Sequence, residues 1–169
     1  RLRQIDDLYH GDVQTLPLTA GNIEREIKEA DMVIGALLVP GGRTPVMITR
    51  AMLKTMKPGA IIVDVSVDQG GCAETTVPRT HDDPVYTVDG VQHYTVANMP
   101  GAYPHTSTYA LTNATLPWIL KLANLGVDRA LEESEPLRKS LNLRDGEIMH
   151  EGVAKAWGNS SPSLFKRGG

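Results

Sequence analysis

In three segments of the sequence an apolar run is followed by glycine or by a carboxylate. Glycine lets the backbone come close to a ligand, and a carboxylate can exchange a proton with it. The three segments are residues 37–41, 65–71 and 96–101. Asp68 is the acidic residue placed directly at one of these ends. A carboxylate there can bond a ribose hydroxyl or move a proton at a reacting carbon. The alternative is that Asp68 only caps the following turn, although loops at strand ends carry function disproportionately.

Other residues that could do chemistry have simpler explanations. Asp64 lies four residues earlier in an apolar segment, and since a buried carboxylate needs partners, we expect it to be structural. Cys72 has no CxxC partner, so we expect it to pack as a small side chain, although a catalytic thiol beside two glycines is possible chemistry. The five histidines show no HxxxH or HExxH spacing, and no metal site is predicted.

A βαβ unit is predicted to position these segments. The apolar runs 32–39 and 60–67 are typical of strands buried on both faces of a parallel sheet. Between them, Thr44 is a candidate N-cap and Pro45 a candidate first helical residue, and Pro58 ends the helix. The crossover between the two strands should be right-handed.

The rest of the chain predicts a hairpin and several helices. Asp89-Gly90 is a strong turn signal between strands at 85–88 and 91–97. A long helix should start at Thr106, kink or break at Pro117 and end at Gly126. The remaining expectations are helices at 2–9, 19–30, 127–141 (partly broken at Pro136) and 147–157, a weak strand at 13–18, and a loose tail at 158–169.

The composition excludes several classes of protein. The 169 residues contain 17 Lys+Arg and 20 Asp+Glu, a net charge of −3 that does not suggest a nucleic-acid partner. With 41% hydrophobic and 22% charged residues the chain is typical of a globular domain. No apolar run approaches the roughly 20 residues that span a bilayer, so no membrane association is expected. The single cysteine fits a reducing, cytoplasmic compartment.

The dinucleotide fingerprint GxGxxG, followed by an acidic residue about 20 positions on, is absent from the sequence. The glycine pairs at 41–42 and 70–71 do not replace it. By itself, the chain therefore lacks a pyrophosphate-binding loop. It also begins with Arg-Leu-Arg, without Met, which suggests a processed chain or a fragment.

Five blocks of the sequence, in order, strongly resemble the alanine dehydrogenase family, which shares its fold with the nicotinamide nucleotide transhydrogenases. The blocks at 63–72 (VDVSVDQGGC) and 106–117 (TSTYALTNATLP) look like the dehydrogenase. The other three blocks are residues 32–41, 56–60 and 96–101, and together the resemblance runs from residue 1 to about 157.

The resemblance implies an α/β fold, an incomplete Rossmann-type doubly wound sheet followed by C-terminal helices. Residues 1–104 would be the C-terminal part of an NAD(H)-binding domain, and residues 105–169 a helical return segment that completes the substrate domain. In the family the glycine loop, the substrate-binding Arg and Lys and a catalytic His precede the residue that matches Arg1. The chain is therefore expected to be the C-terminal part of such an enzyme, inactive alone.

The resemblance also implies roles for particular residues. Asp68 matches the catalytic aspartate, which also lies at the cofactor. Two positions depart from the family: Val77 stands where a basic cofactor contact is common, with Arg79 nearby, and Leu18 where a small polar residue is common, with Thr19 beside it. The implied cofactor contacts are Val65, Ser66 and Val67 at a strand end, Leu37 and Leu38 on the adenosine side, Val96, Ala97, Asn98 and Met99 on the nicotinamide side, and Arg1 near the adenine ribose.

The implied activity is the reversible NAD-dependent oxidative deamination of L-alanine to pyruvate and ammonium, by a homo-oligomer that in this family is usually a hexamer. Two alternatives stay open. The chain could be a non-catalytic remnant or interaction piece, because it lacks the glycine loop, or a transhydrogenase-like NAD(H)-binding subunit without alanine dependence.

Overall fold

A computed structural model describes residues 1–156 as two compact units. Unit 1 comprises Arg1–Leu37 and Pro45–Ala97. Unit 2 comprises Leu38–Thr44 and the described residues from Asn98 onward. Each unit is considered by itself below.

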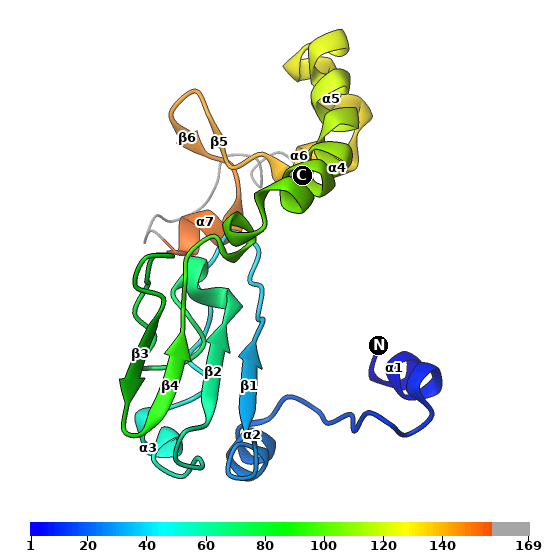
Figure 1. Cartoon of the computed structure of the whole chain (residues 1–169). Coiled ribbons are helices and arrows are strands. Elements are labelled where there is room, and N and C mark those ends of the chain that lie inside the picture. The colour runs from blue at the N-terminus through cyan, green and yellow to red at the C-terminus, as the bar shows by residue number, and fades with distance from the viewer. Residues whose placement is uncertain (157–169) are drawn as a thin grey trace. The chain divides into compact units, whose positions relative to one another are not determined.

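Unit 1 is built on a four-stranded sheet in the order β1 (Met32–Gly35), β2 (Ile61–Asp64), β4 (Val91–Tyr94) and β3 (Val85–Val88) (Figure 1). β1, β2 and β4 run parallel, and β3 pairs antiparallel with β4. The predicted α/β fold class with its βαβ unit is confirmed. The Asp89-Gly90 hairpin is also confirmed, since both residues take the positive φ angles (49° and 84°) that a tight turn requires.

The second predicted strand is wrong beyond Asp64. Residues Val65–Gln69 form a 3₁₀ helix instead of continuing β2. The Asp64 carboxylate accepts the Ser66 backbone N–H at 3.0 Å, which removes that amide from the sheet ladder. β1 likewise ends at Gly35, before the predicted end at Val39.

The predicted helix start at Thr44-Pro45 is also wrong. α3 spans Arg50–Leu53, and its N-cap is Thr49, whose hydroxyl accepts the Met52 N–H at 3.2 Å. The backbone N–H groups of Met47 and Ile48 donate to the Cys72 carbonyl at 2.8 and 3.1 Å. This pairing with a distant segment holds the chain extended, so the local capping signal is overridden.

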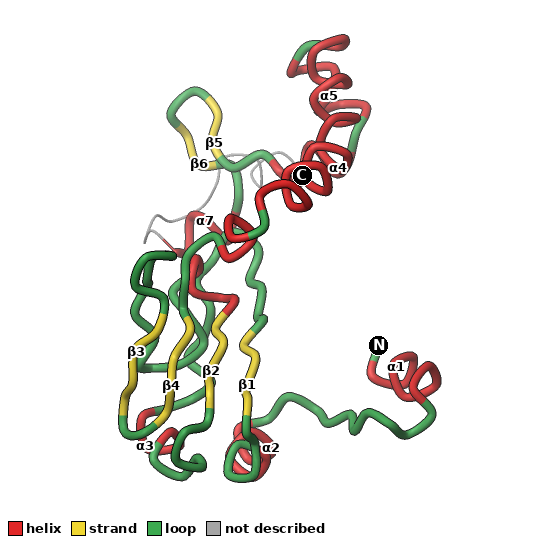
Figure 2. The backbone as a smooth tube through the Cα atoms, viewed as in Figure 1, coloured by secondary structure: helices red, strands yellow, loops and turns green. Residues whose placement is uncertain are grey.

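An apolar cluster joins α2 and α3 of unit 1 to the sheet. It includes Ile27, directly after α2 (Ala20–Glu26), with Leu53 of α3, Ile62 of β2 and Val91 of β4. Thr19 caps α2. The strand predicted at 13–18 does not form, since these residues lie between α1 (Leu2–Tyr9) and α2 without a partner strand (Figure 2).

Unit 2 is mostly helical. Of the kink or break predicted at Pro117, the break is wrong, because α4 (Pro104–Leu125) continues through that residue. Proline removes one helical hydrogen bond, and the leucine- and alanine-rich turns on both sides retain the others. The break predicted near Pro136 falls at Ser134. The remaining elements are a 3₁₀ helix (Met99–Ala102), α5 (Val127–Glu133), α6 (Glu135–Ser140), the two-residue strands β5 (Leu143–Arg144) and β6 (Glu147–Ile148), and α7 (Glu151–Ala156).

The helix predicted at 147–157 forms only from Glu151, because β6 takes the first two residues. Trp157 and the predicted tail at 158–169 lie outside the described residues. Within residues 1–156 no helix has both the length and the apolar character needed to cross a membrane. α4 has no buried residue, and Trp118, Leu111 and Ile119 are among its exposed apolar side chains.

Candidate functional site

The carboxyl ends of three parallel strands meet at one edge of the sheet in unit 1. Gly35 pairs with Asp64 at the ends of β1 and β2, and Val63 pairs with Tyr94 at the ends of β2 and β4. Ligands of open α/β sheets bind beyond such ends. The segments that continue these strands carry seven of the residues predicted from the sequence: Leu37, Val65, Ser66, Val67, Asp68, Val96 and Ala97.

Ser66 joins two of the strand ends. Its hydroxyl accepts the Leu37 backbone N–H at 2.8 Å and donates to the Leu37 carbonyl at 2.9 Å. The side chain is buried, as are those of Val67 and Val96. Any contact of these three residues with a ligand would therefore use the backbone, whereas Asp68 and Val65 have exposed side chains.

Asp64 anchors the segment that carries Asp68. The Asp64 residue is fully buried, and its carboxylate accepts the backbone N–H of Ser66 at 3.0 Å and of Cys72 at 2.8 Å. The Thr76 hydroxyl donates to the same carboxylate at 2.6 Å. These three donors satisfy the buried carboxylate, in agreement with the structural role expected for Asp64. Thr76 carries no signal in the sequence, because no local pattern marks a hydroxyl that meets a carboxylate twelve residues away.

Cys72 is buried beside this carboxylate. Burial, and after it the negative charge of Asp64, raise the pKa of the Cys72 thiol to about 12. The thiolate, which is the nucleophilic form, is therefore not populated near neutral pH. The geometry agrees with the expectation that Cys72 packs rather than reacts.

Arg79, the possible stand-in for a basic cofactor contact, already has partners. Its guanidinium bonds Asp83 at 2.7 Å and lies 4.9 Å from the centre of the Tyr86 ring. Thr19, the other possible stand-in, uses its hydroxyl to cap α2 by accepting the Asn22 N–H at 3.2 Å. In this structure both side chains stabilise the fold locally.

His93 lies on β4 under the Tyr86 ring, with ring centroids 4.9 Å apart. Its Nδ1 lies 3.1 Å from the Val91 carbonyl and its Nε2 lies 2.8 Å from the Thr75 hydroxyl. A carbonyl only accepts, so Nδ1 carries the proton and Nε2 accepts from Thr75. Burial lowers the pKa of His93, which favours this neutral form.

The other predicted contacts lie elsewhere in the chain. Leu38 and Asn98 are exposed and Met99 is half-buried, and all three belong to unit 2. Asn98 has a left-handed backbone with φ of 55°, a conformation that asparagine adopts more readily than most residues. Arg1 is exposed at the start of α1, a helix without buried residues.

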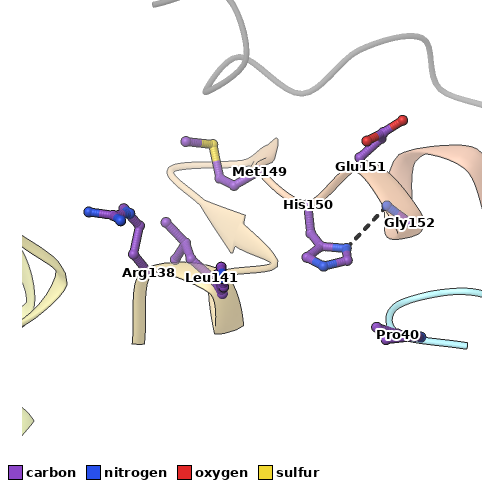
Figure 3. Close-up of a pocket in the computed structure, with 8 residues that line it drawn as sticks. Pro40, Arg138, Leu141, Met149, His150, Glu151 and Gly152 are labelled. Carbon is purple, nitrogen blue, oxygen red and sulfur yellow. Dashed lines mark hydrogen bonds between the residues drawn. The ribbon is translucent and has the colours of Figure 1, made fainter. Parts of the chain in front are cut away.

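Unit 2 contains a cavity of about 590 Å³ (Figure 3). His150 lies on its wall, with its Nδ1 accepting the Gly152 N–H at 3.1 Å. Two charged lining residues are paired within their own helices, Lys139 with Glu135 and Glu151 with Lys155. No residue predicted from the sequence lines this cavity, and we assign it no role.

The strand-end edge fits part of a nicotinamide cofactor. Exposed apolar surface at Val65 suits a flat ring, and Asp68 offers a carboxylate for proton transfer. Among the described residues, no group of three or more His, Cys, Asp or Glu side chains is placed to hold a metal ion. Val65 and Asp68 together suit the edge to acid–base chemistry beside a flat ligand.

Comparisons with known proteins identify the family of the chain. The family model described as "Alanine dehydrogenase/PNT, C-terminal domain" matches residues 1–151. The chain is 51% identical to an alanine dehydrogenase of Halomonas elongata over 158 residues, which cover 94% of this chain and 43% of that protein. It is also 51% identical to alanine dehydrogenase 2 of Staphylococcus aureus, covering 93% of this chain and 42% of the relative.

Solved structures give the same result. An L-alanine dehydrogenase superposes with a TM-score of 0.76 at 44% identity, over 93% of this chain and 43% of the other. A transhydrogenase from Sinorhizobium meliloti superposes with a TM-score of 0.57 at 26% identity, over 79% of this chain and 36% of the other. The chain spans less than half the length of the relatives it matches.

Proposed function

The chain belongs to the alanine dehydrogenase/PNT family and matches its C-terminal domain, and from that premise we propose that it contributes to NAD-dependent oxidative deamination of L-alanine. The reaction consumes L-alanine, water and NAD⁺ and yields pyruvate, ammonium, NADH and a proton. One observation carries the proposal: Asp68 is exposed in a segment otherwise fixed by buried hydrogen bonds, at the carboxyl edge of the parallel strands.

We propose that the cofactor lies against this edge. When bound, NAD⁺ accepts the hydride that leaves the alanine Cα. Val65, Ser66 and Val67, together with Leu37, Val96 and Ala97, would line the site, and Arg1 would contact the adenine ribose. Leu38, Asn98 and Met99 are proposed as cofactor contacts within unit 2. Buried Val67 and Val96 would contribute through their backbone groups, and exposed Val65 through its side chain.

Asp68 is the proposed acid–base residue. Its carboxylate would accept a proton from the water that attacks the imine carbon, or hold the departing amine. The imine forms when the alanine Cα loses its hydrogen as hydride and the nitrogen loses a proton, so that the nitrogen lone pair makes the C=N bond. The oxygen of the added water becomes the carbonyl oxygen of pyruvate, and ammonium leaves. Because the side chain is exposed while the backbone around it is anchored, it can meet substrate without losing its position.

The transhydrogenase-like alternative has weaker support, since identity to the transhydrogenase structure is 26% against 44% for the L-alanine dehydrogenase. A non-catalytic interaction piece is the other alternative.

We also propose a domain division at residue 104, with 105–169 completing the substrate domain. A cytoplasmic location and homo-oligomeric assembly complete the proposal. The unpaired Cys72 supports the location, and the exposed apolar residues of α4 support the assembly.

The deciding experiment uses the complete product of the gene that encodes this chain. NADH formation from NAD⁺ should depend on L-alanine and run backwards with pyruvate and ammonium. Hydride exchange between cofactors without alanine dependence would support the transhydrogenase-like alternative. Neither activity, with the protein folded, would support the interaction piece.

Asp68→Asn tests the role of the carboxylate. The amide cannot accept the proton, so turnover should fall by at least about 100-fold, the scale of general acid–base catalysis. The affinity for NADH, measured by fluorescence titration, should change little because the variant keeps the size of the side chain. Turnover equal to that of the unmodified protein would show that Asp68 has no catalytic role.

A further inference from the structure

We infer that Asp64 and Thr76 form a clamp that positions Asp68 for the reaction, an inference that rests on the proposed function. The clamp is defined as the Asp64 carboxylate and the three groups that donate to it, the backbone N–H groups of Ser66 and Cys72 and the hydroxyl of Thr76. Asp64 and Thr76 are positioning residues, because they would act through Asp68 without contacting substrate.

The donors lie on both sides of Asp68 in the sequence. Ser66 precedes it by two residues, and Cys72 and Thr76 follow it by four and eight. One carboxylate therefore closes the chain into a loop with Asp68 between the fixed points. Within the loop, the Gly70 N–H donates to the Val67 carbonyl and the Gly71 N–H to the Ser66 carbonyl, each at 3.0 Å.

Gly71 shows how closely the chain approaches the clamp. Its φ of +82° favours glycine, and a Cβ there would lie 2.4 Å from Thr76 Cγ2 and 2.8 Å from Asp64 Oδ2. Only a residue without a side chain lets the loop turn back against the carboxylate. Gly71 thus has a role other than approach to a phosphate.

The clamp also reaches the neighbouring strand end. The Ser66 backbone is held by Asp64, and the Ser66 side chain bonds both the N–H and the carbonyl of Leu37. A change at the carboxylate is therefore transmitted to Asp68 and to the segment after β1. The fully buried Asp64 has fixed donors and little freedom to adjust.

Thr76→Val is the sharpest test, because it removes one donor and keeps the branched shape, whereas replacing Asp64 could unfold the protein. Thr75→Val is a matched control: the adjacent hydroxyl also donates one hydrogen bond to a fully buried acceptor, His93, at 2.8 Å. Thr76→Ser restores the hydroxyl. All variants are made in the complete gene product, with kcat and KM measured for L-alanine and NAD⁺.

The clamp predicts a fall in kcat of about 10- to 100-fold for Thr76→Val, the scale expected when a reacting group is displaced by up to about 1 Å. KM should change less than about twofold, Thr76→Ser should recover most of kcat, and Thr75→Val should match the unmodified protein. In an Asp68→Asn background Thr76→Val should have no further effect on kcat, since its effect runs through Asp68. Equal kcat in the two valine variants, or the same fall without the Asp68 carboxylate, would overturn the inference.

Hydrogen exchange separates failure of the clamp from failure of the proposed function. In the 169-residue chain, Thr76→Val should speed exchange at the Gly70, Gly71 and Cys72 amides, which have partners in or beside the clamp, while Thr75→Val leaves them unchanged. Faster exchange without alanine-dependent activity in the unmodified gene product would overturn the catalytic part of the inference together with the proposed function. Unchanged exchange would overturn the clamp itself, whatever the activity.

Discussion

Gly35 at the end of β1 should tolerate no side chain, and the structure gives the reason. A Cβ at this position would lie 2.1 Å from Cys72 Sγ and 3.3 Å from Asp64 Oδ1. Nonbonded heavy atoms need about 3.5–4.0 Å, so the sulfur would have to move by more than about 1 Å. Cys72 is 2% exposed and Asp64 is fully buried, and neither can turn into solvent.

The magnitude follows from this geometry. Overpacking a core costs about 1–3 kcal/mol, and with both neighbours fixed we expect Gly35→Ala to lower the free energy of unfolding by about 3 kcal/mol. Cys72→Ala alone removes one buried sulfur, for about 1 kcal/mol. In the double variant the clash with the sulfur is absent and only the 3.3 Å approach to Asp64 Oδ1 remains. The total loss should therefore stay well below the additive sum of about 4 kcal/mol, at about 1–2 kcal/mol.

The assay is native-state hydrogen exchange at the β2 amides, because it reports on the sheet even if the two units unfold separately. Gly21→Ala is the control, since nothing lies within 4 Å of a Cβ in that α2 position, and a gain of about 0.5–1 kcal/mol is expected. The predicted clash is refuted if the β2 amides are as well protected in Gly35→Ala as in the unmodified protein. It is also refuted if the loss of stability in the double variant equals the sum of the losses in the two single variants.

Three further predictions concern the cap, the thiol and the pH dependence. Thr49→Ala should cost about 1 kcal/mol of stability, because α3 loses its N-cap hydrogen bond. Thr44→Val should be neutral or stabilising, because the buried Thr44 hydroxyl has no hydrogen-bond partner within residues 1–156. Denaturant titration compares the free energies of unfolding of the two variants. Cys72 should resist iodoacetamide in the folded chain at about pH 8 and react after unfolding, as mass spectrometry can show, because the pKa of the thiol is raised to about 12. Burial lowers the pKa of His93 in the folded state, opposed by the charge of Asp64, so the folded chain binds fewer protons than the unfolded one. The contribution of His93 to the free energy of unfolding should therefore be complete above the unfolded pKa of about 6.5 and decrease as the pH falls below it, by at most about 1.4 kcal/mol per pH unit. His93→Gln should flatten this slope, as urea titrations at several pH values can show.

Local signals in the sequence determined several elements correctly. Asp89-Gly90 specifies its hairpin because a tight turn needs positive φ at both residues, and these two residue types accept it. The continuous apolar runs correctly predicted two parallel strands, β1 and β2. The predicted burial on both faces is wrong for β1, because Met32 and Ile34 are exposed. The five sequence blocks identified the family, and the burial argument gave Asp64 its structural role. These features depend on neighbouring residues or on residue type alone.

Tertiary structure decided where those elements end and what surrounds the candidate site. Thr44-Pro45 carries a good helix signal, yet the Cys72 carbonyl holds residues 47 and 48 extended, and the helix begins at Arg50. Residues 65–67 have the composition of a strand, but the Asp64 carboxylate captures an amide that the ladder would need. The role of Thr76 could not be predicted from the sequence, because only the fold brings its hydroxyl to that carboxylate. The bonds of the Cys72 carbonyl and of the Thr76 hydroxyl join residues distant in the sequence, whereas the Asp64–Ser66 bond is local and its acceptor is buried. Buried polar groups must be satisfied wherever their partners lie, and local preferences give way to that requirement.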